Sequence, residues 1–200
     1  GVDPEGDGSP DPRATSLAYD PDRERLVLFG GLADCEVDDG ETSCRNFGDT
    51  WEWDGVSWAR MAGPGPSARM GHTMAWHPGR RAIVMHGGST GMEEGRLADT
   101  WSYDDAGWRL VNSAGPAGDE GSLVWHAGAA QLLYRRGGTF WALADDNTWD
   151  VVLTGTVNLE DGGDYARLQG EALVYDSRHD RLVLVFQTYN GAYGFVTETY

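Results

Sequence analysis

The sequence is poor in the residues and motifs on which most catalytic sites depend. Its 200 residues include two cysteines, five scattered histidines and no lysine, so arginine alone supplies the fifteen cationic side chains. The chain has no Cys-x-x-Cys pair, no HExxH motif and no P-loop. No motif therefore indicates a class of enzyme, and we predict no catalytic residue from the sequence.

Positive charge and long apolar runs are also scarce. The 32 acidic residues outnumber the arginines and give a net charge of -17, with an isoelectric point near 4.4. A nucleic-acid partner is disfavoured, because this field repels phosphate. The longest apolar runs, such as Leu182 to Phe186, have the length of a strand and fall far short of the roughly eighteen residues that cross a bilayer. We therefore expect no membrane insertion.

What the sequence does contain is a repeat. The segment Asp49 to Asp54, followed by Trp58, returns fifty residues later as Asp99 to Asp104, followed by Trp108. A period near fifty that is built of short strands predicts a β-propeller. Residues 1–11, rich in Asp, Gly and Pro, precede the first repeat and are interpreted as a linker that follows a removed or excised segment.

Four strands that each end in an aromatic residue and a turn mark the starts of four repeat units. The aromatic residues are Tyr19, Trp76, Trp125 and Tyr175. A second apolar strand follows each start, and three of these strands lead into a glycine pair: Gly30-Gly31, Gly87-Gly88 and Gly137-Gly138. An aromatic strand with period-two alternation and a short Trp-bearing strand complete the unit. The pattern predicts one four-stranded sheet per repeat.

The second repeat resembles the kelch family most closely. It carries Arg69-Met70-Gly71-His72, Gly87-Gly88, Trp101, Tyr103 and Trp108. The resemblance, which extends to the galactose-oxidase-like propellers of secreted bacterial proteins, implies an all-β fold of four-stranded antiparallel blades. It implies four blades, at residues 12–62, 63–112, 113–154 and 155–200, within a propeller domain that spans residues 12–200. The third and fourth repeats depart from the family pattern.

The fourth blade is expected to be incomplete. Glu198-Thr199-Tyr200 aligns with Asp49-Thr50-Trp51, so the outermost strand would be missing and an open edge would lie at Thr197–Tyr200. We expect a partner chain or further blades to complete this edge. Two alternatives stay open at this point: the chain is a piece of a longer propeller, or it is an open arc of four blades.

Cys35 and Cys44 lie in the long loop between the second and third strands of the first repeat, and we predict that they form a disulfide. Closing this loop would stabilise the fold by about 2 to 3 kcal/mol in the chain-entropy model. A disulfide indicates an oxidising compartment, so we expect a secreted, cell-surface or periplasmic protein. The alternative is two free surface thiols.

Acidic residues crowd the same loop. They are Asp34, Glu36, Asp38, Asp39 and Glu41. Oxygen-rich loops of this kind bind calcium in extracellular proteins, and the alternative is a solvated acidic loop. No other cofactor is expected. The histidines are predicted to be structural, because three of them occupy or border the turn between the first and second strands: His77, His126 and His179.

The resemblance also indicates a ligand-binding face. In adaptor members of the kelch family, the arginine before the first strand of each blade helps to hold acidic peptides. The matching residues here are Arg13, Arg69 and Arg167, with Asp119 and Glu120 at the third blade. An arginine fork holds a carboxylate through two hydrogen bonds. The alternative is that these arginines pair with nearby Asp and Glu residues.

Two long loops, Leu32 to Asn46 and Ser89 to Ala98, would flank the same face and determine specificity. The sequence therefore favours a secreted or cell-surface binding or scaffolding module with a protein or glycan ligand. One alternative is a segment of a carbohydrate-active propeller enzyme, with catalytic groups in acidic central loops or in further blades. A structural domain without a ligand is the third hypothesis.

Overall fold

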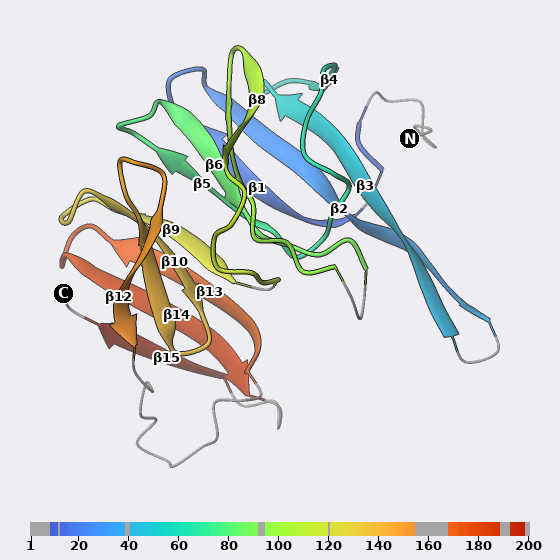
Figure 1. Cartoon of the computed structure of the whole chain (residues 1–200). Helices are drawn as coiled ribbons and strands as arrows, with labels where there is room; N and C mark the ends of the chain where they lie inside the picture. The colour runs from blue at the N-terminus through green and yellow to red at the C-terminus, as the bar shows by residue number, and fades with distance from the viewer. Residues whose placement is uncertain are drawn as a thin grey trace. The chain divides into compact units, whose positions relative to one another are not determined.

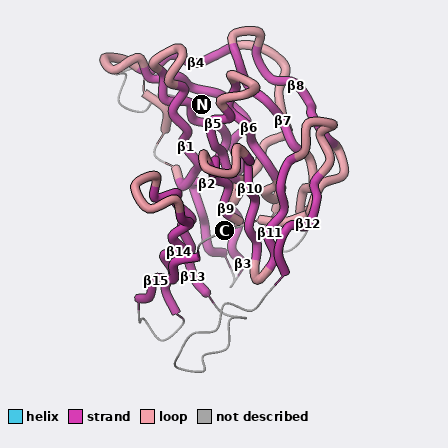
Figure 2. The backbone as a smooth tube through the Cα atoms, turned by 90° about the vertical axis from the view of Figure 1, so that its left-hand side faces the viewer, coloured by secondary structure: helices cyan, strands magenta, loops and turns pink. Residues whose placement is uncertain are grey.

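The computed structural model (Figure 1) consists of strands joined by turns and loops. It describes residues 9–11, 13–38, 41–91, 95–119, 121–154, 168–188 and 193–198. No helix occurs in these ranges, as the tube in Figure 2 shows, and so none there could cross a membrane. By backbone contacts the chain divides into two compact units, Gly1–Asp119 and Glu120–Tyr200.

The first unit contains two four-stranded antiparallel sheets, each with its strands in chain order. We call them blade 1 and blade 2. Blade 1 comprises β1 (Ala14–Asp20), β2 (Arg25–Asp38), β3 (Glu41–Trp53) and β4 (Trp58–Met61). Blade 2 comprises β5 (Thr73–His77), β6 (Ala82–His86), β7 (Thr100–Asp104) and β8 (Gly107–Asn112).

The second unit contains two more antiparallel sheets, blade 3 and blade 4. Blade 3 comprises β9 (Ser122–His126), β10 (Gln131–Arg136), β11 (Thr139–Leu143) and β12 (Trp149–Thr154). Blade 4 has three strands among the described residues: β13 (Leu168–Asp176), β14 (Arg181–Thr188) and β15 (Tyr193–Glu198). The prediction of an all-β fold of antiparallel blades, with the last one incomplete, is confirmed.

Each unit has an apolar core between its two blades. Because side chains alternate along a strand, a blade offers two faces that both need apolar residues. In the first unit, Ala18, Val27 and Phe29 of blade 1 pack against Met74 and Ile83 of blade 2. The equivalent core of the second unit is formed by buried residues of blades 3 and 4: Leu133, Phe140, Ala142, Leu173, Leu182 and Leu184.

The glycine pairs of the first two repeats, one within β2 and one directly after β6, lie where the chain that enters the next blade passes close by. Gly31 donates its backbone N–H to the Arg69 carbonyl at 2.8 Å. Gly30 has a φ of +58°, and a Cβ built there would lie 2.8 Å from the same carbonyl. Positive φ and close backbone approach both require glycine at this position.

The third glycine pair has a different role from the one predicted. Strand pairing places Arg136-Gly137, rather than Gly137-Gly138, at the position of Gly30-Gly31. Gly137-Gly138 instead forms the two-residue turn between β10 and β11, with a φ of +57° at Gly137. Such hairpin turns favour glycine for its positive φ, which explains the misleading match in sequence.

The alignment of Glu198-Thr199-Tyr200 with the Asp-Thr-Trp segment is wrong. The central strands show the true register, because Leu28 pairs with Trp51 and the equivalent Leu184 pairs with Val196. Val196 therefore takes the place of Trp51, four residues before Tyr200. The pairing of the whole strand fixes the register, and a three-residue likeness in a degenerate repeat does not. The unpaired edge of blade 4 is strand β15, whereas Thr199 and Tyr200 lie outside the described residues.

Candidate functional site

The hairpin of β2 and β3 is the longest feature of the first unit. These strands have 14 and 13 residues, whereas the next longest, β13, has 9. β1 pairs with β2 only as far as Leu32, and β4 pairs with β3 only from Thr50 onwards. Residues 33–38 and 41–45 therefore form the two strands of a ribbon, which we name by its full range, 33–45, and which projects beyond the rest of the blade (Figure 1).

A disulfide crosses this ribbon. Cys35 and Cys44 are bonded, with their Cα atoms 4.0 Å apart, which confirms the predicted pairing. A two-stranded hairpin without a packed face is marginally stable in water. The covalent link therefore holds together a ribbon that the blade core does not support.

Aromatic and polar contacts anchor the base of the ribbon. The guanidinium of Arg13 lies 3.6 Å from the ring centre of Phe47, and that of Arg45 lies 4.5 Å from it. The Asn46 side chain donates a hydrogen bond to the Thr90 carbonyl at 2.8 Å. The two long loops that the sequence indicated, 32–46 and 89–98, thus meet at one end of the first unit.

The predicted binding residue Arg69 is buried, with 1% of its side chain exposed, and it is fully engaged. Its two terminal nitrogens bind the two oxygens of Asp99 at 2.6 and 2.9 Å, and it also donates to Gly87 and Ser67. Trp101 donates to Asp99 at 2.7 Å. Although burial alone would raise it, the pKa of Asp99 is lowered, because Arg69 and Trp101 donate hydrogen bonds to the carboxylate.

Arg13 repeats this arrangement in blade 1. It binds Asp49 at 2.5 Å, and Trp51 donates to the same carboxylate at 2.8 Å. Unlike Arg69, it has one buried nitrogen, Nη2, without a hydrogen-bond partner among the described residues. Both arginines therefore pair with nearby aspartates in this structure, which is the alternative that the sequence left open. Their role in holding a ligand stays a prediction.

The remaining predicted binding residues are placed only in part. Asp119 pairs with Arg96 of the second long loop at 3.0 Å, on the surface of the first unit. Arg167 and Glu120 lie outside the described residues. The structure thus brings Arg13, Arg69 and the bases of the two long loops together.

The predicted calcium ligands cannot be placed in the same way. Asp39 lies outside the described residues, and so do the side chains of Asp34, Glu36, Asp38 and Glu41. Among the residues that are described, no three His, Cys, Asp or Glu side chains are arranged to hold a metal ion. Calcium binding by the ribbon stays a prediction.

Two histidines are buried within the first unit and are neutral. Burial, together with the nearby Arg69 guanidinium, lowers the pKa of His72 to about 3. Burial likewise lowers the pKa of His86 to about 4. His86 contacts the Thr100 hydroxyl and the Pro116 carbonyl, each at 2.9 Å. Because the carbonyl only accepts, Nε2 of His86 carries the proton and Nδ1 accepts from the hydroxyl.

The turn histidines show the repeated local role that the sequence predicted. Nδ1 of His77 accepts the backbone N–H of Arg80 at 3.2 Å, and Nδ1 of His126 accepts that of Ala129 at 3.1 Å. His179 departs from this pattern, because the equivalent residue of blade 4 is Asp176, whose carboxylate His179 contacts at 2.7 Å.

The string Gly87-Gly88-Ser89-Thr90-Gly91 matches the Gly-x-Ser-x-Gly form of a nucleophile elbow. Such an elbow presents an exposed serine between a strand and a helix. Ser89 is instead buried and bonds the backbone of Gly91, in a loop that leads to no helix within the described ranges. The motif is therefore a structural loop, and Ser89 is not presented as a nucleophile.

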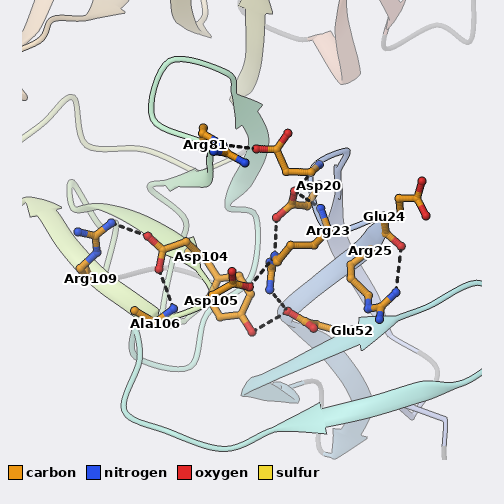
Figure 3. A network of polar contacts seen from close by, with 12 residues as sticks. Asp20, Arg23, Glu24, Arg25, Glu52, Arg81, Asp104, Asp105, Ala106 and Arg109 are labelled. Atoms are coloured by element: carbon orange, nitrogen blue, oxygen red, sulfur yellow. Dashed lines mark hydrogen bonds and ion pairs between the residues drawn. The ribbon is translucent and has the colours of Figure 1, made fainter.

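A polar network lies at the end of the first unit opposite the ribbon, where the turns between the first and second strands are found (Figure 3). Arg23 binds Asp20 at 2.6 Å and Glu52 at 2.7 Å, and Tyr103 of blade 2 donates to Glu52 at 2.9 Å. Burial and the Glu52 carboxylate raise the pKa of Tyr103, so it remains a donor. No motif in the sequence indicated this network, which ties blade 1 to blade 2.

The repeated four-stranded sheets define a β-propeller-like protein. No family model and no curated protein matches the chain. Among solved structures, the chain is similar to that of YjhT, with a TM-score of 0.60 and 16% sequence identity. The match covers 86% of this chain and 58% of that one, so this chain spans less than two thirds of the length of YjhT. At this identity the likeness shows the fold alone.

Proposed function

We propose that this chain is a kelch-type propeller segment that acts outside the cytoplasm as a binding module for a protein or glycan. The ribbon of residues 33–45 is its recognition element. The proposal rests on one observation. This disulfide-linked ribbon projects from a blade whose core is formed without it. Recognition elements commonly take this form, a loop held on a rigid scaffold.

The base of the ribbon supports this role. A binding element needs a fixed orientation. Here the Phe47 ring contacts two arginines, and Asn46 is hydrogen-bonded to the neighbouring loop. The ribbon sequence carries five acidic residues and a single arginine, Arg45, which favours a partner with basic groups. The disulfide supports a location in an oxidising compartment.

The proposal is tested by removing the ribbon without disturbing the blade. Residues 34–44 are replaced by Asn-Gly, which closes Ala33 and Arg45 with a two-residue hairpin turn and keeps the anchors at the base. Wild type and truncated protein are then screened in parallel against a glycan array and a library of basic and neutral peptides.

We expect the wild type to retain members of one library and the truncated protein to lose them, with the thermal unfolding of the blades unchanged. Equal retention by the two proteins would show that the ribbon is not the recognition element. A wild type that retains nothing from either library would contradict the binding function itself.

A further inference from the structure

The backbone ladder of the ribbon is interrupted where the disulfide crosses it. Ala33 of β2 pairs with Arg45 of β3. The next pair along the ladder is Glu36 with Ser43. Two residues of β2 therefore face a single residue of β3, and both cysteines are among these three residues. Such a β-bulge leaves one residue unpaired and disrupts the hydrogen bonds of the ladder, so the covalent link lies where the backbone pairing is broken.

Beyond this bulge the ribbon continues as a short hairpin. We call residues 36–38 and 41–43 the ribbon tip. Its strands are joined by three residue pairs: Glu36 with Ser43, Val37 with Thr42 and Asp38 with Glu41. The core cluster of the first unit includes none of the described residues of the ribbon. Three pairs without support from a core form a hairpin of marginal stability, so the disulfide determines whether the tip strands stay together.

The two bonded cysteines differ in their access to solvent. Cys35 is exposed, whereas Cys44 is half-buried. A disulfide is reduced when a thiolate attacks one of its two sulfurs, and the rate depends on access to that sulfur. Access therefore favours attack at Cys35.

The charges beside the two cysteines favour the same direction of attack. Cys35 stands between Asp34 and Glu36 in the sequence, whereas Cys44 is followed by Arg45. The sulfur that is not attacked departs as a thiolate, and positive charge next to a cysteine stabilises its thiolate. Cys44 is therefore the better leaving group, and its departure requires attack at Cys35.

We propose that the Cys35–Cys44 disulfide is a redox switch for the ribbon tip, with Cys35 as the attacked residue and a dithiol as the reductant. The oxidised form keeps the tip strands paired, and the reduced form releases them. This switch rests on the proposed function, because release of the tip changes binding only if the ribbon is the recognition element. The thiol chemistry itself does not depend on a ligand.

Reduction takes two steps. A thiolate of the dithiol bonds to Sγ of Cys35 while the bond between the two cysteine sulfurs breaks, and Cys44 leaves as a thiolate. The second thiolate of the dithiol then attacks its own partner sulfur in the mixed disulfide and displaces Cys35. Two electrons pass to the cysteines, the dithiol becomes a disulfide, and its two protons end on the two cysteine thiols.

The attacked sulfur is identified with a monothiol, which stops at the mixed disulfide. The native chain is treated with 2-mercaptoethanol and quenched with excess iodoacetamide, and the modified peptides are identified by mass spectrometry. We expect mercaptoethanol on Cys35 and the acetamide group on Cys44. Mercaptoethanol attached equally to the two cysteines, or mainly to Cys44, would overturn the assignment of Cys35.

The release of the tip is measured by hydrogen exchange before and after reduction with dithiothreitol. We expect the tip amides to be protected in the oxidised chain and to exchange at the rates of an unfolded peptide in the reduced chain, with β6 unchanged. The double variant Cys35→Ser, Cys44→Ser is the control, and it should match the reduced chain with or without dithiothreitol. The switch would be refuted by a tip whose exchange is unaltered by reduction. A disulfide that reacts only when the blades unfold would refute it as well.

Binding is compared between the oxidised wild type and the double serine variant, with a ligand that the screen retains. The variant should bind about tenfold more weakly or worse, because a released loop must be ordered when it binds. Equal affinities beside a released tip would remove the regulatory role and leave the proposed function standing. The exchange and labelling measurements need no ligand, so they test the switch even where the screen fails.

Discussion

Replacing Arg69 by methionine tests whether the repeated Arg-Asp-Trp arrangement stabilises the fold. The change keeps much of the side-chain volume but removes five hydrogen bonds and leaves the Asp99 carboxylate with the Trp101 donor. Breaking a fully buried pair by removing one partner costs about 3 to 5 kcal/mol, and because the Asp99 side chain is 20% exposed we expect a cost at the lower end of this range. Against a typical stability of about 5 to 15 kcal/mol, this loss is large and measurable.

The matched control is Arg109→Met, which breaks an ion pair with Asp104 on the surface. Arg109 is 63% exposed, and exposed pairs contribute about 0.2 to 1 kcal/mol. Urea unfolding at neutral pH, followed by tryptophan fluorescence, measures both changes in the free energy of unfolding. If Arg69→Met does not fold, Arg69→Lys keeps the charge and loses the fork, and we expect an intermediate cost. A difference of less than about 1 kcal/mol between Arg69→Met and Arg109→Met would refute the reasoning.

The same pair predicts a pH dependence. The pKa of Asp99 is lowered in the folded protein, so its contribution to stability is present above the ordinary carboxyl pKa and is lost as the pH falls through the folded value. Arg69→Met removes a main cause of this lowering. The stability difference between wild type and variant should therefore be largest near neutral pH and should shrink in acid.

Two backbone predictions follow from the turns and the glycine pairs. Gly88 and Gly107 have nearly equal φ, +95° and +91°, but a Cβ at Gly88 would lie 2.7 Å from the Met70 carbonyl and one at Gly107 would touch nothing. Gly107→Ala should lower the free energy of unfolding by about 1 to 2 kcal/mol because of φ alone, and Gly88→Ala should lower it by about 1 to 3 kcal/mol more. Equal losses in urea unfolding would contradict the close approach at Gly88. Ala130 has a φ of +52°, so Ala130→Gly should leave stability unchanged or raise it by up to about 1 kcal/mol. Ala129→Gly should lower stability. Calorimetric melts in which both variants lose stability equally would contradict this reasoning.

The sequence predicts the blades well because their pattern arises from packing that every repeat shares. Trp101 and Trp108 pack against the core that blades 1 and 2 share. Trp51 and Trp58 hold the same positions in blade 1, and all four lie on blade strands as expected. The disulfide was also predictable, because both cysteines lie in one loop.

The candidate site was harder to predict, because its partners are distant in sequence. Asp49 and Asp99 open the two copies of the Asp-Thr-Trp segment, and this recurrence is the signal that could have identified them as the partners of Arg13 and Arg69. The network around Arg23 had no such signal, since it depends on which strand ends meet in space. Its residues carry no repeated motif.

The fourth blade shows where pattern matching fails. The fourth repeat lacks the glycine pair and the tryptophans of the family pattern. A short likeness near Tyr200 therefore suggested a register that the strand pairing contradicts. Register follows from the alternation of buried and exposed residues along a whole strand, as Leu182, Leu184 and Val185 show. Three residues cannot determine it.

The most direct test of the account is the hydrogen-exchange footprint of the full chain with a ligand that the screen retains. Binding through the recognition element predicts that protection rises in the ribbon of residues 33–45 and in the neighbouring loop that contains Thr90, which Asn46 anchors. The turns at the opposite end of the first unit, around Arg23, should exchange as before. Protection at those turns, with none in the ribbon, would contradict the account.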